Sequence, residues 1–413
     1  MPTGREMFLA LAAIPFIYYL IALFSSWRYF RQLEIATDSA FNPPVSILKP
    51  IRGLDKDAYE NLVSFCQLDY PEYEIVCCVD PDDQAVLGVL AKLTRNFPQC
   101  NIRVLYGSGR VATNDKVAKL ARLVNEAAYE HVVISDSDVR VRPDYIRQVI
   151  APLRDPKVGA TTCIYVPTDV TTLTDRLQTI GMMSDFYAGV LVDWQLEGIK
   201  FALGPTIATT RTRLSNFGGY AALENRPADD LLVGRLIAAQ GCEVMLLRYA
   251  IETVCDYGSF RELLHKRLRW VVVMRHMRRW GHLGLAFTQG LPLALLATAI
   301  HPTRSVGLAY LGIYFVLRSA MTWLIGIHGL RQHFLWRDLP LIPLWDAIAF
   351  AIWLTSFGRS SIRWRGADYY IRRGCLVPVI PETEALPARS ASHATPAFSR
   401  QPVRSDLAGL RDR

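Results

Sequence analysis

The chain is predicted to fold as an α/β protein in which a mostly parallel sheet carries helices on both faces. Between residues 42 and 258, short runs rich in Val and Ile alternate with stretches of helical periodicity, and repeated β-α-β order favours parallel strands. Long apolar segments precede and follow this stretch, and several approach the roughly 20 residues that a bilayer-spanning helix needs. We therefore expect an α/β domain at 42–258, joined at both ends to membrane helices.

The strand and helix signals follow one another along the first part of the domain. The first strand is expected where an apolar, β-leaning run lies between prolines. Later strands are runs of the same kind, and the helices between them have apolar residues at helical spacing. The expected strands are 45–49, 74–79, 101–106, 131–135 and 158–166, and the expected helices are 58–66, 85–97, 116–128 and 143–153.

Four apolar segments stand out, at residues 7–24, 287–300, 306–327 and 339–357. The first resembles a signal peptide, but its apolar run is long and no small-x-small cleavage site follows it. A basic and aromatic border follows instead, as is typical of a cytoplasmic membrane edge. Residues 1–27 are therefore expected to be an uncleaved anchor that leaves the α/β domain in the cytoplasm.

The C-terminal membrane region is predicted to cover residues 285–375. A third complete crossing there would put the arginines of residues 359–373 outside, against the positive-inside tendency. Asp346, with two prolines before it, also favours an interfacial or re-entrant course for the last apolar segment. We expect three full spans and one partial span in the whole chain. The tail at 382–413, rich in Pro, Ala, Ser and Arg, is expected to be disordered.

A basic amphipathic helix is expected over residues 259–284. Its arginines alternate with large apolar residues, which is the composition of a helix lying in the membrane interface. The net charge of +8 gathers here and near residues 359–373, so an anionic membrane surface is favoured as the partner over nucleic acid. The eight cysteines show no paired spacing, which favours free thiols in a reducing compartment over disulfides or metal ligands.

Two carboxylates, Asp136 and Asp138, follow the strand expected at 131–135. A plain surface turn would explain them, but Asp80 follows another strand of the same predicted sheet. The carboxyl ends of parallel strands meet at one edge, where ligands bind. Oxygen ligands of this kind suit Mg²⁺ or Mn²⁺, which can in turn hold phosphates. We therefore predict a metal site at Asp136 and Asp138.

Three further motifs accompany this pair in a fixed order. Each also has a plainer explanation: a solvated turn, a helix N-cap at Asp229, or anchoring of a helix at lipid headgroups. Together the four motifs resemble the D, DxD, (E/D)D and (Q/R)xxRW marks of family 2-like processive and lipid glycosyltransferases. The matching residues are Asp80 with Asp83, Asp136 with Asp138, Asp229 with Asp230, and Lys266 with Arg269 and Trp270.

The closer resemblance is to the ceramide glucosyltransferases of glycosyltransferase family 21 and their bacterial relatives, including hopanoid-associated glycosyltransferases. It covers roughly residues 42–290 and, weakly, the C-terminal membrane part, and it implies a GT-A-like, Rossmann-like domain. Two residues depart from the family pattern: Lys266 stands where the family has Gln or Arg, and Lys119 where it has Asn. The segments that carry the resemblance are 44–50, 59–65, 67–71, 114–116 and 204–208.

The resemblance implies a role for each motif residue. Asp230 would deprotonate the acceptor hydroxyl, while Asp136 and Asp138 would hold Mg²⁺ or Mn²⁺ on the diphosphate. Basic groups would face the phosphates, although Lys116 and Lys119 would equally suit an exposed helix face. The residues expected at the phosphates are Lys116, Lys266 and Arg269, and those expected near the uridine are Asp80 and Asp83. Asp229 would be a further substrate-binding residue, and Trp270 would border the donor pocket or pack the interface helix. Gly204 and Thr206 belong to the segment that resembles the acceptor-side loop.

We expect a membrane-bound, inverting glycosyltransferase that moves one sugar from a UDP-sugar to a lipid hydroxyl. A basic interface helix beside the site favours a lipid acceptor, with ceramide and a hopanoid polyol as the leading candidates. The expected location is the bacterial inner membrane, with the catalytic domain in the cytoplasm. Two alternatives stay open: a processive polysaccharide synthase, which would need more spans, and an inactive membrane scaffold that binds nucleotide sugars.

Overall fold

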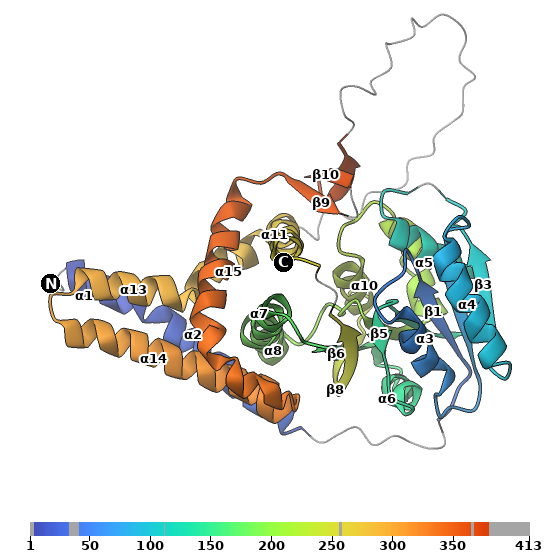
Figure 1. The fold of residues 1–413 in the computed structure, drawn as a ribbon, viewed down its shortest axis with the longest axis horizontal. Coiled ribbons are helices and arrows are strands. Elements are labelled where there is room, and N and C mark those ends of the chain that lie inside the picture. Colours follow the sequence, from blue (N-terminus) through green and yellow to red (C-terminus); the bar gives the residue numbers. More distant parts are fainter. Residues whose placement is uncertain (1–3, 33–40, 111, 256–257, 365–366, 380–413) are drawn as a thin grey trace, which may run out of the picture.

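The computed structural model describes residues 4–32, 41–110, 112–255, 258–364 and 367–379. Its centre is a mixed sheet with the strand order β3-β2-β1-β4-β7-β6-β8-β5 (Figure 1). Every expected strand is confirmed, and β5, β7 and β8 are additional. The strands are β1 (Val45–Pro50), β2 (Tyr73–Val79), β3 (Ile102–Tyr106), β4 (His131–Ser135), β5 (Val139–Arg140), β6 (Val158–Thr168), β7 (Thr206–Thr210) and β8 (Glu243–Val254).

The sheet is less uniformly parallel than predicted. β1 runs parallel to β2 and β4, β2 to β3, and β6 to β8. β7 lies antiparallel between β4 and β6, and β5 is antiparallel to β8. β7 was not predicted because its five residues, TIATT, include a single large apolar side chain. Since β1, β2 and β4 are parallel, their carboxyl ends still meet at one edge, as expected.

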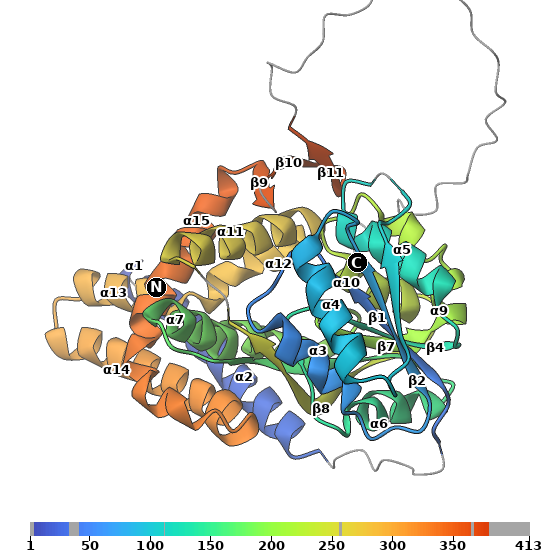
Figure 2. The ribbon, with the colours of Figure 1, turned by 45° about the vertical axis from the view of Figure 1, so that its right-hand side comes forward.

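Helices cover both faces of the sheet, as predicted (Figures 1 and 2). Alternate residues of β1 point to opposite faces, so that Ile47 joins the core under α3, α4 and α6, whereas Leu48 joins the core under α5 and α10. Both side chains are fully buried, and each contributes on the order of 1.5–3 kcal/mol to stability. The helices of the domain are α3 (Ala58–Cys66), α4 (Gln84–Asn96), α5 (Asp115–Glu126), α6 (Tyr145–Ile150), α7 (Leu173–Gly181), α8 (Tyr187–Glu197), α9 (Arg211–Ser215) and α10 (Asp229–Ala238).

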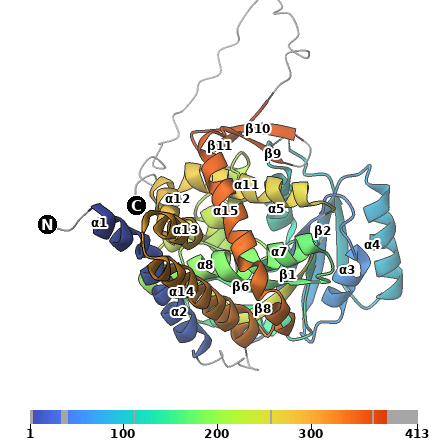
Figure 3. The same cartoon turned by 60° about the vertical axis from the view of Figure 1, so that its left-hand side comes forward.

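Apolar helices extend from one side of the domain, where α1, α2, α13 and α14 lie side by side (Figures 1 and 3). Within the described residues, three helical segments are long and apolar enough to cross a membrane, and a fourth is bent by 47°. The three segments are Gly4–Phe30, Arg304–Gly329 and Leu339–Phe357, and the bent one joins 279–288 to 290–300. The helices are α1 (Gly4–Ala12), α2 (Ile14–Phe30), α13 (Gly290–Ile300), α14 (Arg304–Thr322) and α15 (Ile342–Phe357).

The predicted partial span and the helix that is actually interrupted are two different apolar segments. We expected 339–357 to be the partial span, but by length it is a continuous helix, and the break falls in the second apolar segment. At 1.5 Å per residue, the short helix α13 reaches only about half of a bilayer core. α15 nevertheless runs across α14 instead of along it (Figures 1 and 3), which is the course expected of an interfacial helix.

The charge that argued against a span in α15, Asp346, has a buried partner. Arg318 of α14 donates from Nε to Asp346 Oδ2 at 2.9 Å and from Nη2 to Asp185 Oδ1 at 2.9 Å, while Tyr314 Oη donates to Asp346 Oδ2 at 2.7 Å. The exposed fractions are 2% for Arg318 and 7% for Asp346. Because each charge is paired and hydrogen-bonded, the cluster can lie among apolar helices.

The predicted basic helix is present as α11 (Phe260–Met277) and α12 (Arg279–Gly284). One side of α11 packs against α15 and against a small antiparallel sheet, so part of its apolar surface is inside the protein. That sheet falls in the region expected to be membrane helix, and its strands are β9 (Ser361–Trp364), β10 (Ala367–Arg372) and β11 (Cys375–Pro378). The eight cysteines are free thiols, as predicted, and the tail at 382–413 lies outside the described residues.

Candidate active site

The sheet edge singled out by the sequence carries the predicted polar residues. β2 ends just before Asp80 and β4 just before Asp136, with β1 between them. α5 packs on β1 and β2 and begins at the same edge, where the side chain of Asn114 caps its first turn. Lys116 and Lys119 lie one turn apart at this end of α5, so both reach the acidic residues.

Lys116 links two of the predicted motifs. Its Nζ lies 2.6 Å from Asp136 Oδ1 and 4.0 Å from Asp229 Oδ2. Burial by itself would lower the pKa of Lys116, but the neighbouring carboxylates outweigh burial and raise the pKa, so the ammonium stays charged. The structure thus brings the second and third acidic motifs together around one fixed positive charge.

Lys119 does not lie on an exposed helix face, because its side chain is only 1% exposed. Its Nζ contacts Asp80 Oδ1 at 2.9 Å, Asp115 Oδ2 at 3.2 Å and the carbonyl oxygen of Ile51 at 2.9 Å. An ammonium group has three donors, and these contacts use all of them. Lys119 therefore orients Asp80 and keeps no N–H for a ligand, which is the structural consequence of Lys at this position.

Lys49 is a site residue that the sequence analysis missed. This lysine is fully buried on β1, with its Nζ 3.4 Å from the centre of the Phe65 ring. It donates to Ser135 Oγ at 3.1 Å and to the Asp136 carbonyl oxygen at 2.9 Å, and burial lowers its pKa to about 7. Lys49 therefore stabilises the turn after β4 from the buried side. The available signal was a lysine inside an otherwise apolar strand.

The turn after β4 presents Asp136 and Asp138 together. Burial and the negative charge of Asp136 raise the pKa of Asp138 to about 6, as expected for two carboxylates with too little positive charge near them. Magnesium is commonly bound by one or two carboxylates, and substrate phosphates and water complete its shell. The pair fits such an ion. Within the described residues, no group of three or more His, Cys, Asp or Glu side chains is placed to hold a metal alone.

Asp230 is held by the backbone at the start of α10. Its Oδ2 accepts from the Gly204 N–H at 3.1 Å and its Oδ1 from the Leu231 N–H at 2.8 Å. A Cβ at Gly204 would lie 3.1 Å from Asp230 Oδ2, so a larger residue there would crowd the carboxylate. Burial, and then the charge of Asp229, raise the pKa of Asp230 to about 6, close to that of a base that works at neutral pH.

The N-cap prediction for Asp229 is wrong. Ala228 occupies the N-cap position of α10 and offers no side-chain cap, while Asp229 is the first helical residue and is 8% exposed. A carboxylate in the first turn is still favoured by the helix dipole. Its side chain is turned toward Lys116, so the structure brings Asp229 into the charged cluster.

The residues of α11 divide between two environments. Lys266 and Trp270 lie one turn apart, with Lys266 Nζ 5.7 Å from the centre of the Trp270 ring. The charge of Lys266 also opposes the rise in the pKa of Asp138, which brings this lysine into the electrostatics of the acidic pair. Arg269 was expected at the phosphates, but its guanidinium lies 5.3 Å from the Trp364 ring on β9.

Two other predicted site residues have structural partners. Asp83 caps α4, since its Oδ1 accepts from the Val86 N–H at 3.2 Å, and its Oδ2 accepts from the Gly53 N–H at 3.0 Å. Thr206 is fully buried, with its hydroxyl 3.0 Å from the Tyr145 hydroxyl. Asp83 therefore shapes the loops beside Asp80, and Thr206 packs beneath the site.

The order and geometry of these motifs can be compared with known families. The sequence profile described as Glycosyl transferase family 21 matches residues 7–377, which is most of the chain. The chain belongs to glycosyl transferase family 21. The match includes the first apolar helices and the C-terminal region as well as the α/β domain, so all three parts of this family 21 chain fall within it.

Curated relatives carry the same resemblance. Ceramide glucosyltransferase 1 of Caenorhabditis elegans is 24% identical over 313 residues, which cover 74% of this chain and 64% of the relative. Ceramide glucosyltransferase 3 of the same organism is 25% identical over 267 residues, 62% of this chain and 55% of the relative. The ceramide glucosyltransferase of Komagataella phaffii is 30% identical over 151 residues, which cover 34% of this chain and 29% of the relative. The family 21 chain thus matches less than two thirds of each relative's length.

A solved structure shares the fold. The mannosyltransferase PcManGT from Pyrobaculum calidifontis, in complex with GDP-Man and Mn²⁺, superimposes with a TM-score of 0.58 at 18% identity. The match covers 85% of this chain and 98% of that one. This likeness, together with the mixed sheet and its helices, confirms the GT-A-like fold expected for the family 21 chain.

Proposed function

We propose that this family 21 chain is an inverting glycosyltransferase that moves one sugar from a UDP-sugar to the hydroxyl of a membrane lipid. The observation that carries the proposal is the placement of Asp230. Its carboxylate lies in one charged cluster with Asp229, Lys116 and Asp136, and its pKa is raised to about 6. A base and a phosphate-binding site therefore stand side by side, which is what sugar transfer from a nucleotide requires.

The transfer needs one proton acceptor and one displaced group. The acceptor oxygen bonds to the anomeric carbon of the sugar as the bond from that carbon to the diphosphate oxygen breaks. The hydroxyl proton passes to Asp230, and the nucleoside diphosphate leaves with the bonding pair. Attack from the face opposite the leaving group inverts the anomeric configuration. The backbone donors of Gly204 and Leu231 keep the Asp230 carboxylate in place for this step.

Positive charge around the leaving group supports the same chemistry. Lys116 lies against Asp136 and stays protonated, so its positive charge can stabilise the negative charge that develops on the diphosphate. Asp136 and Asp138 would hold Mg²⁺ or Mn²⁺, which when bound would neutralise that charge further. Lys266 of α11 adds positive charge near Asp138.

The donor is proposed to be a UDP-sugar. Asp80, oriented by Lys119, has a second carboxylate oxygen that can accept an N–H from a nucleobase. Uracil offers one such N–H.

The acceptor is proposed to be a lipid, with ceramide or a hopanoid polyol as the leading candidates. The site adjoins α11, whose Lys266 lies near Asp138 and which also carries four arginines, and the apolar helices follow α12. Exposed Trp280, at 79%, suits the headgroup level of a bilayer. The catalytic domain would then face the cytoplasm, at the bacterial inner membrane, with the acceptor hydroxyl presented at headgroup depth.

The enzyme is tested by supplying membranes that contain the chain with UDP-glucose, UDP-galactose or UDP-N-acetylglucosamine, one at a time. Lipid products are then identified by mass spectrometry. Asp230→Asn is expected to lower product formation by roughly 10²-fold or more, because the proton acceptor is lost. Asp155→Asn, at an exposed turn before β6, is the matched control and should leave activity unchanged. Unchanged lipid glycosylation in Asp230→Asn would refute the proposed function and favour a scaffold.

A further inference from the structure

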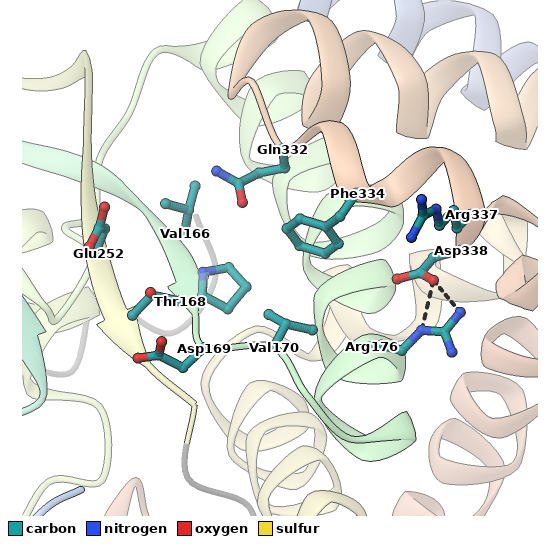
Figure 4. A pocket seen from close by; sticks show the side chains of 11 residues that line it. Val166, Thr168, Asp169, Val170, Arg176, Glu252, Gln332, Phe334, Arg337 and Asp338 are labelled. Carbon is teal, nitrogen blue, oxygen red and sulfur yellow. Dashed lines mark hydrogen bonds and ion pairs between the residues drawn. The ribbon is translucent and has the colours of Figure 1, made fainter. Parts of the chain in front are cut away.

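A cavity lies where the central sheet meets the C-terminal helices (Figure 4). It has a volume of about 520 Å³, within the range of about 300–1,000 Å³ that is usual for small-molecule sites. One wall is the end of β6 and the loop after it, together with Glu252 of β8. The opposite wall is the short helix His333–Arg337, with Gln332 before it and Asp338 after it. None of the residues assigned to sugar transfer lines this cavity.

The wall formed by the short helix contains a buried carboxylate, Asp338, with one oxygen that has no hydrogen-bond partner. Asp338 is 2% exposed, and its Oδ1 accepts from Arg176 Nε at 2.7 Å and from a second nitrogen of the same guanidinium. Its Oδ2 is buried and has no hydrogen-bond partner. In Figure 4 this oxygen points toward Phe334 and the interior of the cavity. A buried acceptor without a partner is costly, so it indicates a missing donor.

The charges of the lining favour a neutral ligand rich in hydroxyl or amide groups. The Arg176–Asp338 pair is internally neutral, which leaves the carboxylates of Asp169 and Glu252 against the guanidinium of Arg337. The excess of negative charge disfavours an anionic phospholipid headgroup. Carboxylates are acceptors for O–H and N–H groups, and the ring of Phe334 offers an apolar surface beside Asp338, on the wall opposite Asp169 and Glu252 (Figure 4).

The cavity is tied to the acidic pair by the sheet. The N–H of Val254 donates to the carbonyl of Asp138 at 3.0 Å, and the N–H of Cys255 donates to the carbonyl of Thr168 at 3.4 Å. Thr168, which lines the cavity, is therefore two strand spacings from Asp138, on the order of 10 Å. On the other side, the cavity is bounded by the segment that joins α14 to α15, with Phe334 and Trp336 exposed at 38% and 57%.

We propose that this cavity binds the non-reacting part of the acceptor's headgroup, namely the hydroxyl and amide groups of a neutral membrane lipid. The inference rests on the proposed function and extends it by naming the acceptor subsite. Asp338 Oδ2, Glu252 and Asp169 accept hydrogen bonds from the headgroup, and Phe334 covers the start of its apolar chain. The reacting hydroxyl then extends along the sheet edge toward the acidic pair.

The first test compares two substitutions on the same strand. Glu252→Gln removes a charged acceptor from the cavity, whereas Glu243→Gln changes another exposed carboxylate, at the other end of β8. With short-chain ceramide in detergent micelles and a fixed UDP-sugar, Glu252→Gln should raise the KM for ceramide roughly five- to tenfold. The KM for the UDP-sugar, and its slow hydrolysis without lipid, should match those of Glu243→Gln and so report an intact donor site.

The second test locates the lipid without turnover. In the Asp230→Asn variant, a ceramide with a diazirine beside its amide should cross-link to peptides containing 166–170 or 331–338, and unlabelled ceramide should compete. Cross-links confined to other segments would refute the cavity as the acceptor subsite, as would equal ceramide KM values for the two Glu variants. If the wild-type protein hydrolyses UDP-sugar but glycosylates neither ceramide nor a hopanoid polyol, the proposed function fails and the subsite fails with it.

Discussion

Transfer activity is expected to fall in mild acid as Asp230 takes up a proton. The titratable groups near this carboxylate are Asp229 on its own helix, Lys116 on α5, Asp136 after β4 and the buried Tyr220. The N–H groups of Gly204 and Leu231 donate to it. Burial and then Asp229 raise the pKa, and Lys116 opposes them, with a net result of about 6 against a usual value of 3.8. A base acts only when deprotonated, so a raised pKa moves the acid limb of activity to higher pH.

The size of the effect follows from the pKa. With a pKa of about 6, roughly nine tenths of Asp230 is deprotonated at pH 7 but only about one tenth at pH 5, so kcat/KM should fall nearly tenfold over this interval. With the usual value of 3.8, more than about nine tenths would remain active at pH 5. The two cases are easily separated by measuring kcat/KM for the UDP-sugar between pH 4.5 and 8.

A second variant tests whether the fall of kcat/KM in acid is due to Asp230. Asp138 also has a pKa raised to about 6, but the main causes of that rise are burial and Asp136, whereas Asp229 is a main cause of the rise at Asp230. Asp229→Asn removes a negative neighbour of Asp230, so it should move the midpoint of the limb to lower pH, whatever it does to the maximal rate. Asp155→Asn should leave the midpoint in place. A wild-type midpoint near 4, or a midpoint that Asp229→Asn does not move, would contradict the assignment of Asp230 as the base.

Three further predictions concern the metal, the turn and the buried charges. Excess EDTA should abolish transfer and added Mn²⁺ or Mg²⁺ should restore it; undiminished turnover in EDTA would count against the metal at Asp136 and Asp138. Lys49→Met should lower kcat/KM by about tenfold or more without unfolding the domain, because the turn loses two hydrogen bonds, whereas exposed Lys157→Met should have no effect. Arg318→Met should destabilise the protein by about 3–5 kcal/mol, since it leaves the buried carboxylate of Asp346 unpaired. The comparison is thermal unfolding in detergent against Arg304→Met, at an exposed position of α14, and equal melting temperatures would show that the buried pair is not needed.

The sequence by itself determined the elements of the first half of the domain and the sheet edge at which its acidic motifs lie. β1, α3 and β4 begin at the predicted residues, because the spacing of apolar residues and the flanking prolines are local properties of the chain. The acidic motifs at Asp80 and Asp136 could be placed at one edge of the sheet because β-α-β order makes the strands parallel, and the carboxyl ends of parallel strands lie at the same edge. The resemblance added roles, and the family match confirmed which family it indicated.

The tertiary structure decided which charges act together. No local pattern links Lys119 to Asp80 or Arg318 to Asp346, although both lysine and arginine are buried and each needs a partner. The partner of a buried charge is set by how distant helices pack, and this also turned Arg269 toward the small C-terminal sheet. The direction of β7, the break before α13 and the cavity beside Asp338 depend on the same long-range packing, which a single sequence does not encode in any short stretch.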